Sequence, residues 1–308
     1  MARYIVRRLL LAIPVLIGAS FLIFAMVFAL PGDPIRGLAG DRPLSPAVLQ
    51  QLRDEYNLND SLPVQYGKYV GNLVQGDLGT DFSGRPVADT LKQTVPITVK
   101  LAIVALIFEA VIGLAAGVLA GIRRKSFFDN LVLVSTTLVV SIPVFVLGFL
   151  AQYSLGLKLG IFPISGVQAG FPAGYLLPGF VLAALSLAYV ARLTRTSLVE
   201  NLRNDYVRTA KAKGLSPLSV VGKHTLRNSL IPVVTFLGVD LGALLGGAIV
   251  TEGIFNIPGL GRTVFQAIQR QEGTVVVGIV TLFVFVYIVF NLIVDVMYAA
   301  LDPRIRYE

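Results

Sequence analysis

Long apolar runs separated by polar segments dominate the pattern of this chain. A transmembrane helix needs about 20 predominantly apolar residues, and six runs approach that length. They are Leu9–Leu30, Leu101–Ile122, Leu131–Leu157, Tyr175–Ala191, Ser229–Val250 and Thr274–Leu301. The fourth run is short, and we expect the nearby prolines Pro172 and Pro178 to break it. The pattern predicts an all-α, polytopic membrane protein with six transmembrane helices.

The composition also indicates a lipid environment. Only 14% of the 308 residues are charged and 55% are hydrophobic, whereas soluble domains carry about 25% charged residues. The chain has no cysteine and a single histidine, His224. These counts exclude disulfides, thiolate catalysis and metal motifs built on cysteines or paired histidines. We therefore predict no catalytic residue, no metal site and no enzyme activity.

The cations are concentrated on one side of the predicted membrane. With the N-terminus inside, the inner segments hold 16 cations against five acids, and the outer segments hold ten of each. Cytoplasmic loops of membrane proteins carry an excess of Lys and Arg, so this distribution predicts that both termini are cytoplasmic. It also explains the net charge of +8 without nucleic acid as a partner.

Two polar segments are long enough to fold outside the bilayer. Residues 31–97 form an outer segment, and residues 192–228 form the only long cytoplasmic one. We therefore divide the chain into residues 1–93, the first transmembrane helix with a long extracytoplasmic region, and residues 94–300. The second part is a core of five helices that carries the cytoplasmic loop.

Glycines recur at four-residue spacing in two of the predicted spans. They are Gly113, Gly117 and Gly121 in the second span, and Gly238, Gly242 and Gly246 in the fifth. Small residues at this spacing allow helices to approach closely. We interpret both stripes as packing surfaces, within the bundle or against a partner chain. A narrow substrate path lined by backbone is the alternative.

Two acids, Glu109 and Asp240, lie in the middle of predicted spans. An ionised side chain at the centre of the bilayer costs at least about 2.5 kcal/mol. We therefore expect each carboxyl group to face a wet cavity or a polar partner. A place on a translocation path and a buried structural hydrogen bond both remain open.

The cytoplasmic segment contains the basic stretch DYVRTAKAKGL at residues 205–215. Asn204 or Asp205 can cap a helix with its side-chain oxygen, and Gly214 suits the left-handed position after a helix. Ser216 followed by Pro217 is typical of a second helix start. The stretch therefore predicts two short helices joined by a tight turn.

The first of these helices has two different faces. Tyr206, Val207 and Ala210 share one face, with Arg208 and Lys211 opposite. A helix this short is not stable alone in water, so it must pack against its own membrane helices, the lipid surface or a protein partner. A solvated positive-inside loop is the alternative.

A nearby match to a nucleotide-binding motif fails. The letters GKHT at residues 222–225 suggest the end of a phosphate-binding loop, Gly-x4-Gly-Lys-Ser/Thr. However, Pro217 stands where the first glycine is required, and His224 stands where the hydroxyl is required. We therefore predict that any ATP hydrolysis is performed by another chain.

Several stretches along the chain resemble those of a known protein family. The stretches YVRTAKAKGL and KHTLRNSLIPVV resemble the cytoplasmic loop of permease subunits of ABC importers for dipeptides, oligopeptides and nickel. The stretches RRLLLAIPVLIGASFLIFAMVFALPGDP, LPVQYGKYVGNLVQGDLGTDF, RPVADTLKQTVPITVKLA and TEGIFNIPGLGRTVFQAI resemble other parts of the same permeases. Arg208-Thr209-Ala210 departs from the Glu-Ala-Ala of the general importer signature, and RQEGTVVVG departs from the usual spacing in an outer loop.

The resemblance implies a type I ABC importer fold in the bacterial cytoplasmic (inner) membrane. It implies a second related permease, two ATP-binding subunits that hold ATP and Mg, and an extracytoplasmic substrate-binding protein, with no cofactor in this chain. The cargo would be a dipeptide or a short oligopeptide. The implied ATPase-coupling residues are Tyr206, Val207, Arg208, Thr209, Ala210, Lys211, Ala212, Lys213, Gly214 and Leu215.

A second function class is compatible with part of the pattern. The intramembrane acids Glu109 and Asp240 would also suit a secondary transporter or channel driven by an ion gradient. That class leaves the basic cytoplasmic stretch unexplained. An intramembrane enzyme is disfavoured, because one loop histidine and no cysteine leave no credible nucleophile pair.

Overall fold

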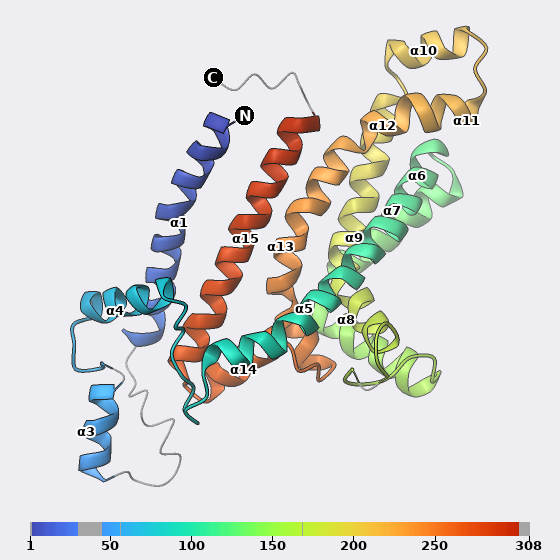
Figure 1. Cartoon of the computed structure of the whole chain (residues 1–308). Coiled ribbons are helices and arrows are strands. Elements are labelled where there is room, and N and C mark those ends of the chain that lie inside the picture. The colour runs from blue at the N-terminus through green and yellow to red at the C-terminus, as the bar shows by residue number, and fades with distance from the viewer. Residues whose placement is uncertain (1, 30–44, 56, 168, 302–308) are drawn as a thin grey trace. The chain divides into compact units, whose positions relative to one another are not determined.

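The computed structural model describes residues 2–29, 45–55, 57–167 and 169–301, and its regular elements there are helices (Figure 1). In chain order they are α1 (Ala2–Phe28), α3 (Pro46–Glu55), α4 (Leu62–Val74), α5 (Val87–Phe108), α6 (Leu114–Ile122), α7 (Phe127–Ser141), α8 (Val144–Ala151), α9 (Ala173–Asn201), α10 (Asp205–Ala212), α11 (Pro217–Ser219), α12 (Leu226–Ser229), α13 (Ile231–Ile254), α14 (Leu260–Gln269) and α15 (Gly273–Leu301). The all-α prediction is confirmed.

Three short π-helical segments interrupt this series. They are η1 (Glu109–Gly113) between α5 and α6, η2 (Gln152–Lys158) after α8, and η3 (Val220–Thr225) between α11 and α12. Segments of this kind inside α-helices occur frequently at functional sites. Here η1 begins with Glu109, one of the two intramembrane acids, and η3 follows the basic stretch at residues 205–215.

The predicted third span is bent. In the described part of the chain, five helices are long and apolar enough to cross a membrane, and the count is six if the pair α7 and α8 forms one span. This pair turns by 105°. At the bend, Ile142 is extended (φ −103°, ψ 127°), because a residue that precedes a proline avoids the helical region. The hydropathy pattern did not reveal the break at Pro143, because the residues on both sides of this proline are apolar.

The predicted fourth span is longer than expected and is not broken. Helix α9 begins directly after Pro172 and includes Pro178, so the expected break is wrong. Pro178 is past the first turn of α9, so the carbonyl of Gly174 loses its usual intrahelical partner there, but the helix continues through this position. At its other end α9 continues to Asn201, so the first ten residues of the segment predicted as the loop 192–228 are helical.

The packing groups the chain into two compact units. One holds the described residues up to Thr98 together with Pro258–Leu292, and the other holds Val99–Ile257 with the end of α15 from Ile293. Helices α5 and α15 therefore contribute to both units. The predicted boundary at residue 93 stays a prediction. It divides the chain at one point in the sequence, whereas each packing unit combines segments that are distant in sequence.

In the second unit, α9 packs against α6, α7 and α13. The first glycine stripe faces α9: a Cβ atom built on Gly117 would lie 2.5 Å from the carbonyl oxygen of Ala191. Packing within the bundle is therefore confirmed for this stripe. The other stripe is mixed, because a Cβ on Gly238 would lie 2.6 Å from Val294, whereas one on Gly246 would meet nothing within 4 Å.

An ion pair fixes α7 to α9 in the same unit. Arg195 donates from Nε to Oδ1 of Asp129 (2.5 Å) and from Nη2 to Oδ2 (2.9 Å). This bidentate contact fixes geometry as well as charge. The backbone N–H of Lys125 also donates to Oδ2 (2.7 Å). The carboxylate thus ties the turn before α7 to the last part of α9.

Aromatic side chains connect α1 and α4 in the first unit. The ring of Tyr66 lies edge-on to the ring of Phe21 at a centroid distance of 5.1 Å, and its hydroxyl group lies 2.8 Å from Oγ of Ser20. Tyr69 donates to Oγ1 of Thr281 on α15 (3.1 Å). These contacts fix α4 against two apolar helices.

Candidate functional site

The basic stretch at residues 205–215 and the segment after it form a helical hairpin, in which α10 packs on η3 (Figure 1). Ser216 caps the second helix, because its Oγ accepts a hydrogen bond from the N–H of Ser219 (3.3 Å). Gly214 has φ +75°, so both of these predictions are confirmed. The N-cap of α10 is Asn204, but its side chain does not accept a backbone hydrogen bond. The prediction of side-chain capping at this end is wrong. The Nδ2 group of Asn204 instead donates to Oδ1 of Asn201 (3.3 Å).

Backbone hydrogen bonds close the end of α10. The N–H of Gly214 donates to the carbonyl of Lys211 (2.9 Å), and the N–H of Leu215 donates to the carbonyl of Ala210 (3.3 Å). This paired arrangement with a left-handed glycine is a common helix ending. A side chain with a Cβ atom at position 214 would be strained in this conformation.

The inner face of α10 packs on the chain itself. Val207 and Ala210 are buried and contact Val220 of η3, with Leu202 beside them. Tyr206 does not share their burial: it is 38% exposed, and its hydroxyl donates to Oδ1 of Asn201 (3.0 Å). Of the three packing partners that the sequence left open, the structure shows the chain's own helices.

The outer face of α10 and the turn after it are exposed and basic. Its exposed members are Tyr206, Arg208, Thr209, Lys211, Ala212, Lys213, Gly214 and Leu215. The guanidinium of Arg208 lies 3.3 Å from the carboxylate of Asp205, and both side chains are more than three-quarters exposed. Pairs this exposed add little stability. The hairpin is therefore held by its apolar side and presents a charged surface, which we call the α10 face.

The two intramembrane acids lie together in the second unit. Glu109 begins η1 and is fully buried, and Asp240 on α13 is partly buried. Their carboxyl groups are close enough to interact, and Ser186 of α9 lies beside Asp240. Both oxygens of Glu109 and Oδ2 of Asp240 are buried without a hydrogen-bond partner. The sequence identified both residues but not that they face each other, since they are distant along the chain.

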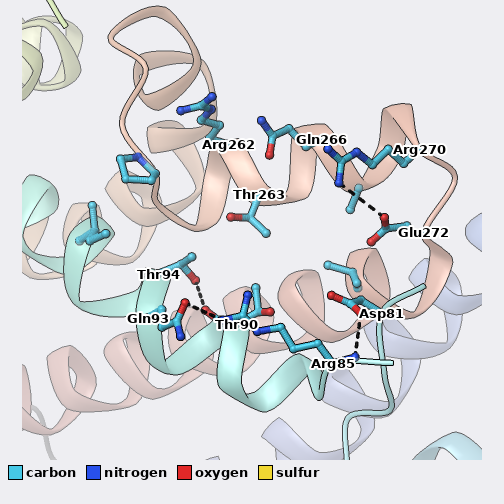
Figure 2. Close-up of a pocket in the computed structure, with 14 residues that line it drawn as sticks. Asp81, Arg85, Thr90, Gln93, Thr94, Arg262, Thr263, Gln266, Arg270 and Glu272 are labelled. Carbon is cyan, nitrogen blue, oxygen red and sulfur yellow. Dashed lines mark hydrogen bonds and ion pairs between the residues drawn. The ribbon is translucent and has the colours of Figure 1, made fainter. Parts of the chain in front are cut away.

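A polar cleft in the first unit was not predicted from the sequence (Figure 2). It has a volume of about 570 Å³ and lies between α14 and the start of α5, with the turn at residues 81–85 and the start of α15 at one end. We call it the α5–α14 cleft. The sequence feature that could have revealed the cleft is the amphipathic pattern of α14. Val264 and Ala267 are buried, while Arg262, Thr263 and Gln266 line the cleft.

Known proteins are similar to this chain in sequence and in fold. The family described as "Binding-protein-dependent transport system inner membrane component" matches residues 113–307, and the family of the N-terminal part of such components matches residues 1–102. The chain is 41% identical to the glutathione transport system permease protein GsiC of Escherichia coli O6:H1, over 100% of both chains. It is 40% identical to GsiC of Shigella dysenteriae serotype 1, with the same coverage.

Solved structures show a similar fold at lower sequence identity. Two crystal forms of the MetNI methionine ABC transporter in inward-facing conformations match with TM-scores of 0.54 and 0.58. Each match is 21% identical and covers 69% of this chain and 96% of the other. The chain therefore belongs to the family of binding-protein-dependent transport system inner membrane components, and it is a permease subunit of an ABC importer with the type I transmembrane fold.

Proposed function

We propose that this permease, with a second related permease, forms the membrane pathway of an ATP-driven importer for short peptides. Permeases of this family are not enzymes and carry no cofactor, because the nucleotide binds to the partner ATPase. An ABC importer also requires a substrate-binding protein in general. The observation that carries the proposal is the α10 hairpin. It offers no group of residues suited to catalysis, and it exposes a basic face that can bind another protein.

We propose that the α10 face docks on one ATPase subunit and transmits its motion. Residues 206–215 then fall into two groups. Val207 and Ala210 hold the helix on its own chain, while Tyr206 and the exposed residues after it contact the partner. Basic side chains on an interface rim increase the rate of association with an acidic partner.

The proposed orientation follows the charge distribution. Both termini and the α10 hairpin lie in the cytoplasm, and the α5–α14 cleft lies on the outer side of the bacterial cytoplasmic membrane. The excess of cations in the inner segments supports this orientation. Labelling of the cleft from outside the cell, described below, tests it.

The names of the full-length relatives support a peptide of two or three residues as the cargo. The full-length relatives described above are named glutathione permeases, and glutathione is a tripeptide. The resemblance of the sequence to dipeptide and oligopeptide permeases supports the same class of cargo. We therefore propose peptides with free charged ends as substrates, with glutathione among them.

Uptake by the reconstituted importer tests this function. The two permeases and two ATPase subunits are placed in lipid vesicles, the binding protein is added outside, and entry of labelled glutathione and labelled dialanine is measured. We expect uptake of at least one of them to require both ATP and the binding protein, and to persist when ionophores collapse the ion gradients. Uptake that an ion gradient drives without ATP would instead show a secondary transporter.

We also propose that Asp240 lies on the translocation path and that Glu109 positions it. Two carboxylates that face each other in an apolar region repel each other, so neutral amides of the same shape relieve strain there. We expect Glu109→Gln and Asp240→Asn to assemble normally, and Asp240→Asn to change the uptake rate or the preference among peptides. Normal transport by both variants, or failure of both to assemble, would exclude this role. Asp89→Asn, which alters an exposed carboxyl group on α5, is the matched control.

A further inference from the structure

The α5–α14 cleft has an acidic end. Asp81 and Glu272 lie at the same end, and the guanidinium of Arg270 is 3.9 Å from Glu272 (Figure 2). Burial raises the pKa of the Glu272 carboxyl group, the nearby Asp81 raises it further, and Arg270 opposes both effects. At this end of the cleft two carboxyl groups lie beside one arginine, whose guanidinium stays 3.9 Å from Glu272. A second cation placed beside them would be stabilised.

A different group lies along the α5 side of the same cleft. Arg85 extends along α5 toward Gln93, and its Nη2 donates to the neutral Oε1 of that amide (3.0 Å) (Figure 2). Asp81 fixes the turn that carries Arg85, because its Oδ1 accepts from the backbone N–H groups of Ser83 and Arg85 (2.8 and 2.9 Å). Arginine has five N–H donors in a planar fork that matches a carboxylate. The guanidinium is therefore held in place and has donors left for an anionic group.

Uncharged polar side chains line the space between these groups. Thr263 of α14 and Thr94 of α5 lie on facing sides of the cleft (Figure 2). Each hydroxyl donates to a backbone carbonyl of its own helix, at 2.8 Å in both cases, so its lone pairs stay available to a ligand N–H. A volume of about 570 Å³ falls within the range of about 300–1,000 Å³ that is typical of small-molecule pockets.

We propose that the α5–α14 cleft is a receiving site for a short peptide with free ends, which binds its ammonium group at Asp81 and Glu272 and its carboxylate at Arg85. The inference rests on the proposed function and deepens it, because it assigns a peptide site to this chain in addition to the one on the binding protein. A concave cleft with opposite charges at separate places suits a small zwitterion better than a flat protein contact.

Protection of a single cysteine tests the site. The chain has no native cysteine, so Thr263→Cys provides one thiol inside the cleft, of nearly the same size as the residue that it replaces. The assembled importer carrying this change, without binding protein, is treated from outside with a membrane-impermeant maleimide, and labelling of this chain is followed over time. We expect trialanine at ten times its Kd to slow the labelling about tenfold, because the free fraction falls as 1/(1 + [L]/Kd).

A peptide with blocked ends and variants of the charged residues test whether the charged ends of trialanine are recognised. N-acetyl-trialanine-amide has the same backbone without the two charges, and we expect it not to protect. Arg85→Gln and Glu272→Gln, each combined with Thr263→Cys, are expected to raise the apparent Kd of trialanine at least about tenfold, since each removes a charge-assisted contact. Lys92→Gln removes an exposed cation of α5 that lies outside the cleft, and it should leave protection unchanged.

Two results would overturn the proposal, namely no protection by trialanine and equal protection by the blocked peptide. If the binding protein, added in a separate reaction, protects the thiol and trialanine does not, the cleft is a protein-docking surface instead. The uptake experiment above separates this outcome from failure of the proposed function. An importer that takes up peptide although its cleft thiol is not protected would retain the function and lose this site.

Discussion

Replacing Gly117 with valine is expected to prevent stable folding of the second unit. A Cβ atom at this position would lie 2.5 Å from the carbonyl oxygen of Ala191 and 2.5 Å from the Cβ atom of Thr194. The carbonyl belongs to the backbone of α9, which cannot rotate away as a flexible side chain can. Overpacking of a core typically costs about 1–3 kcal/mol, and we expect at least the upper end of that range here. Loss of chain from the membrane fraction and a lowered melting temperature in detergent would show it.

Other glycines of the same spacing provide the controls. Gly246→Ala should leave the melting temperature close to that of the wild type, because a Cβ atom there meets nothing within 4 Å. Gly117→Ala should lie between the two, since it adds only the first atom of the clash. Equal stability of Gly117→Val and the wild type would mean that α6 and α9 are not in close contact.

Placing a glutamate at Ala210 is expected to uncouple the importer from its ATPase subunits. Ala210 is 5% exposed and lies against Val220, so a carboxylate there is buried without a partner, which costs several kcal/mol. We expect α10 to detach from its own chain and the α10 face to be lost. Co-purification of the ATPase subunits and peptide-stimulated ATP hydrolysis should fall together, while cargo capture by the binding protein is unchanged.

Two further substitutions separate the fold of the hairpin from its docking. Gly214→Val forces a β-branched residue into a left-handed conformation and should resemble Ala210→Glu. Lys211→Glu leaves the buried side intact and reverses a charge on the α10 face, so it should weaken co-purification without unfolding the hairpin. Arg208→Ala should be milder, because a rim charge mainly affects the association rate. Wild-type coupling in Ala210→Glu would mean that the hairpin is only a solvated loop.

The hairpin shows how far local sequence reasoning extends. The turn at Gly214 and the cap at Ser216 depend on a few neighbouring residues, and both are confirmed. The face of α10 that is buried depends on Val220 and Leu202, which lie outside the helix. Helical periodicity grouped Tyr206 with Val207 and Ala210, but it does not reveal that the tyrosine hydroxyl has a partner at Asn201 and remains partly exposed.

The spans show the same limit in the membrane. Hydropathy located each apolar run, because transfer into lipid depends on composition along the chain. It did not show that the run around Pro143 bends by 105°, or that α9 tolerates Pro178 and continues beyond the apolar region to Asn201. The bend at Pro143 and the continuity of α9 depend on how the backbone hydrogen bonds lost at each proline are replaced, which neighbouring helices decide.

The sequence alone determined that this chain is an all-α membrane protein with a basic helical hairpin, and its motifs indicated the importer family. These features follow from hydrophobicity, charge and turn chemistry, which act between near neighbours. Only the tertiary structure brought Glu109 beside Asp240 and placed Arg85, Asp81 and Glu272 around one cleft. Such groupings join residues that are distant in sequence, and they arise from the packing of whole helices, which no local pattern of residues records.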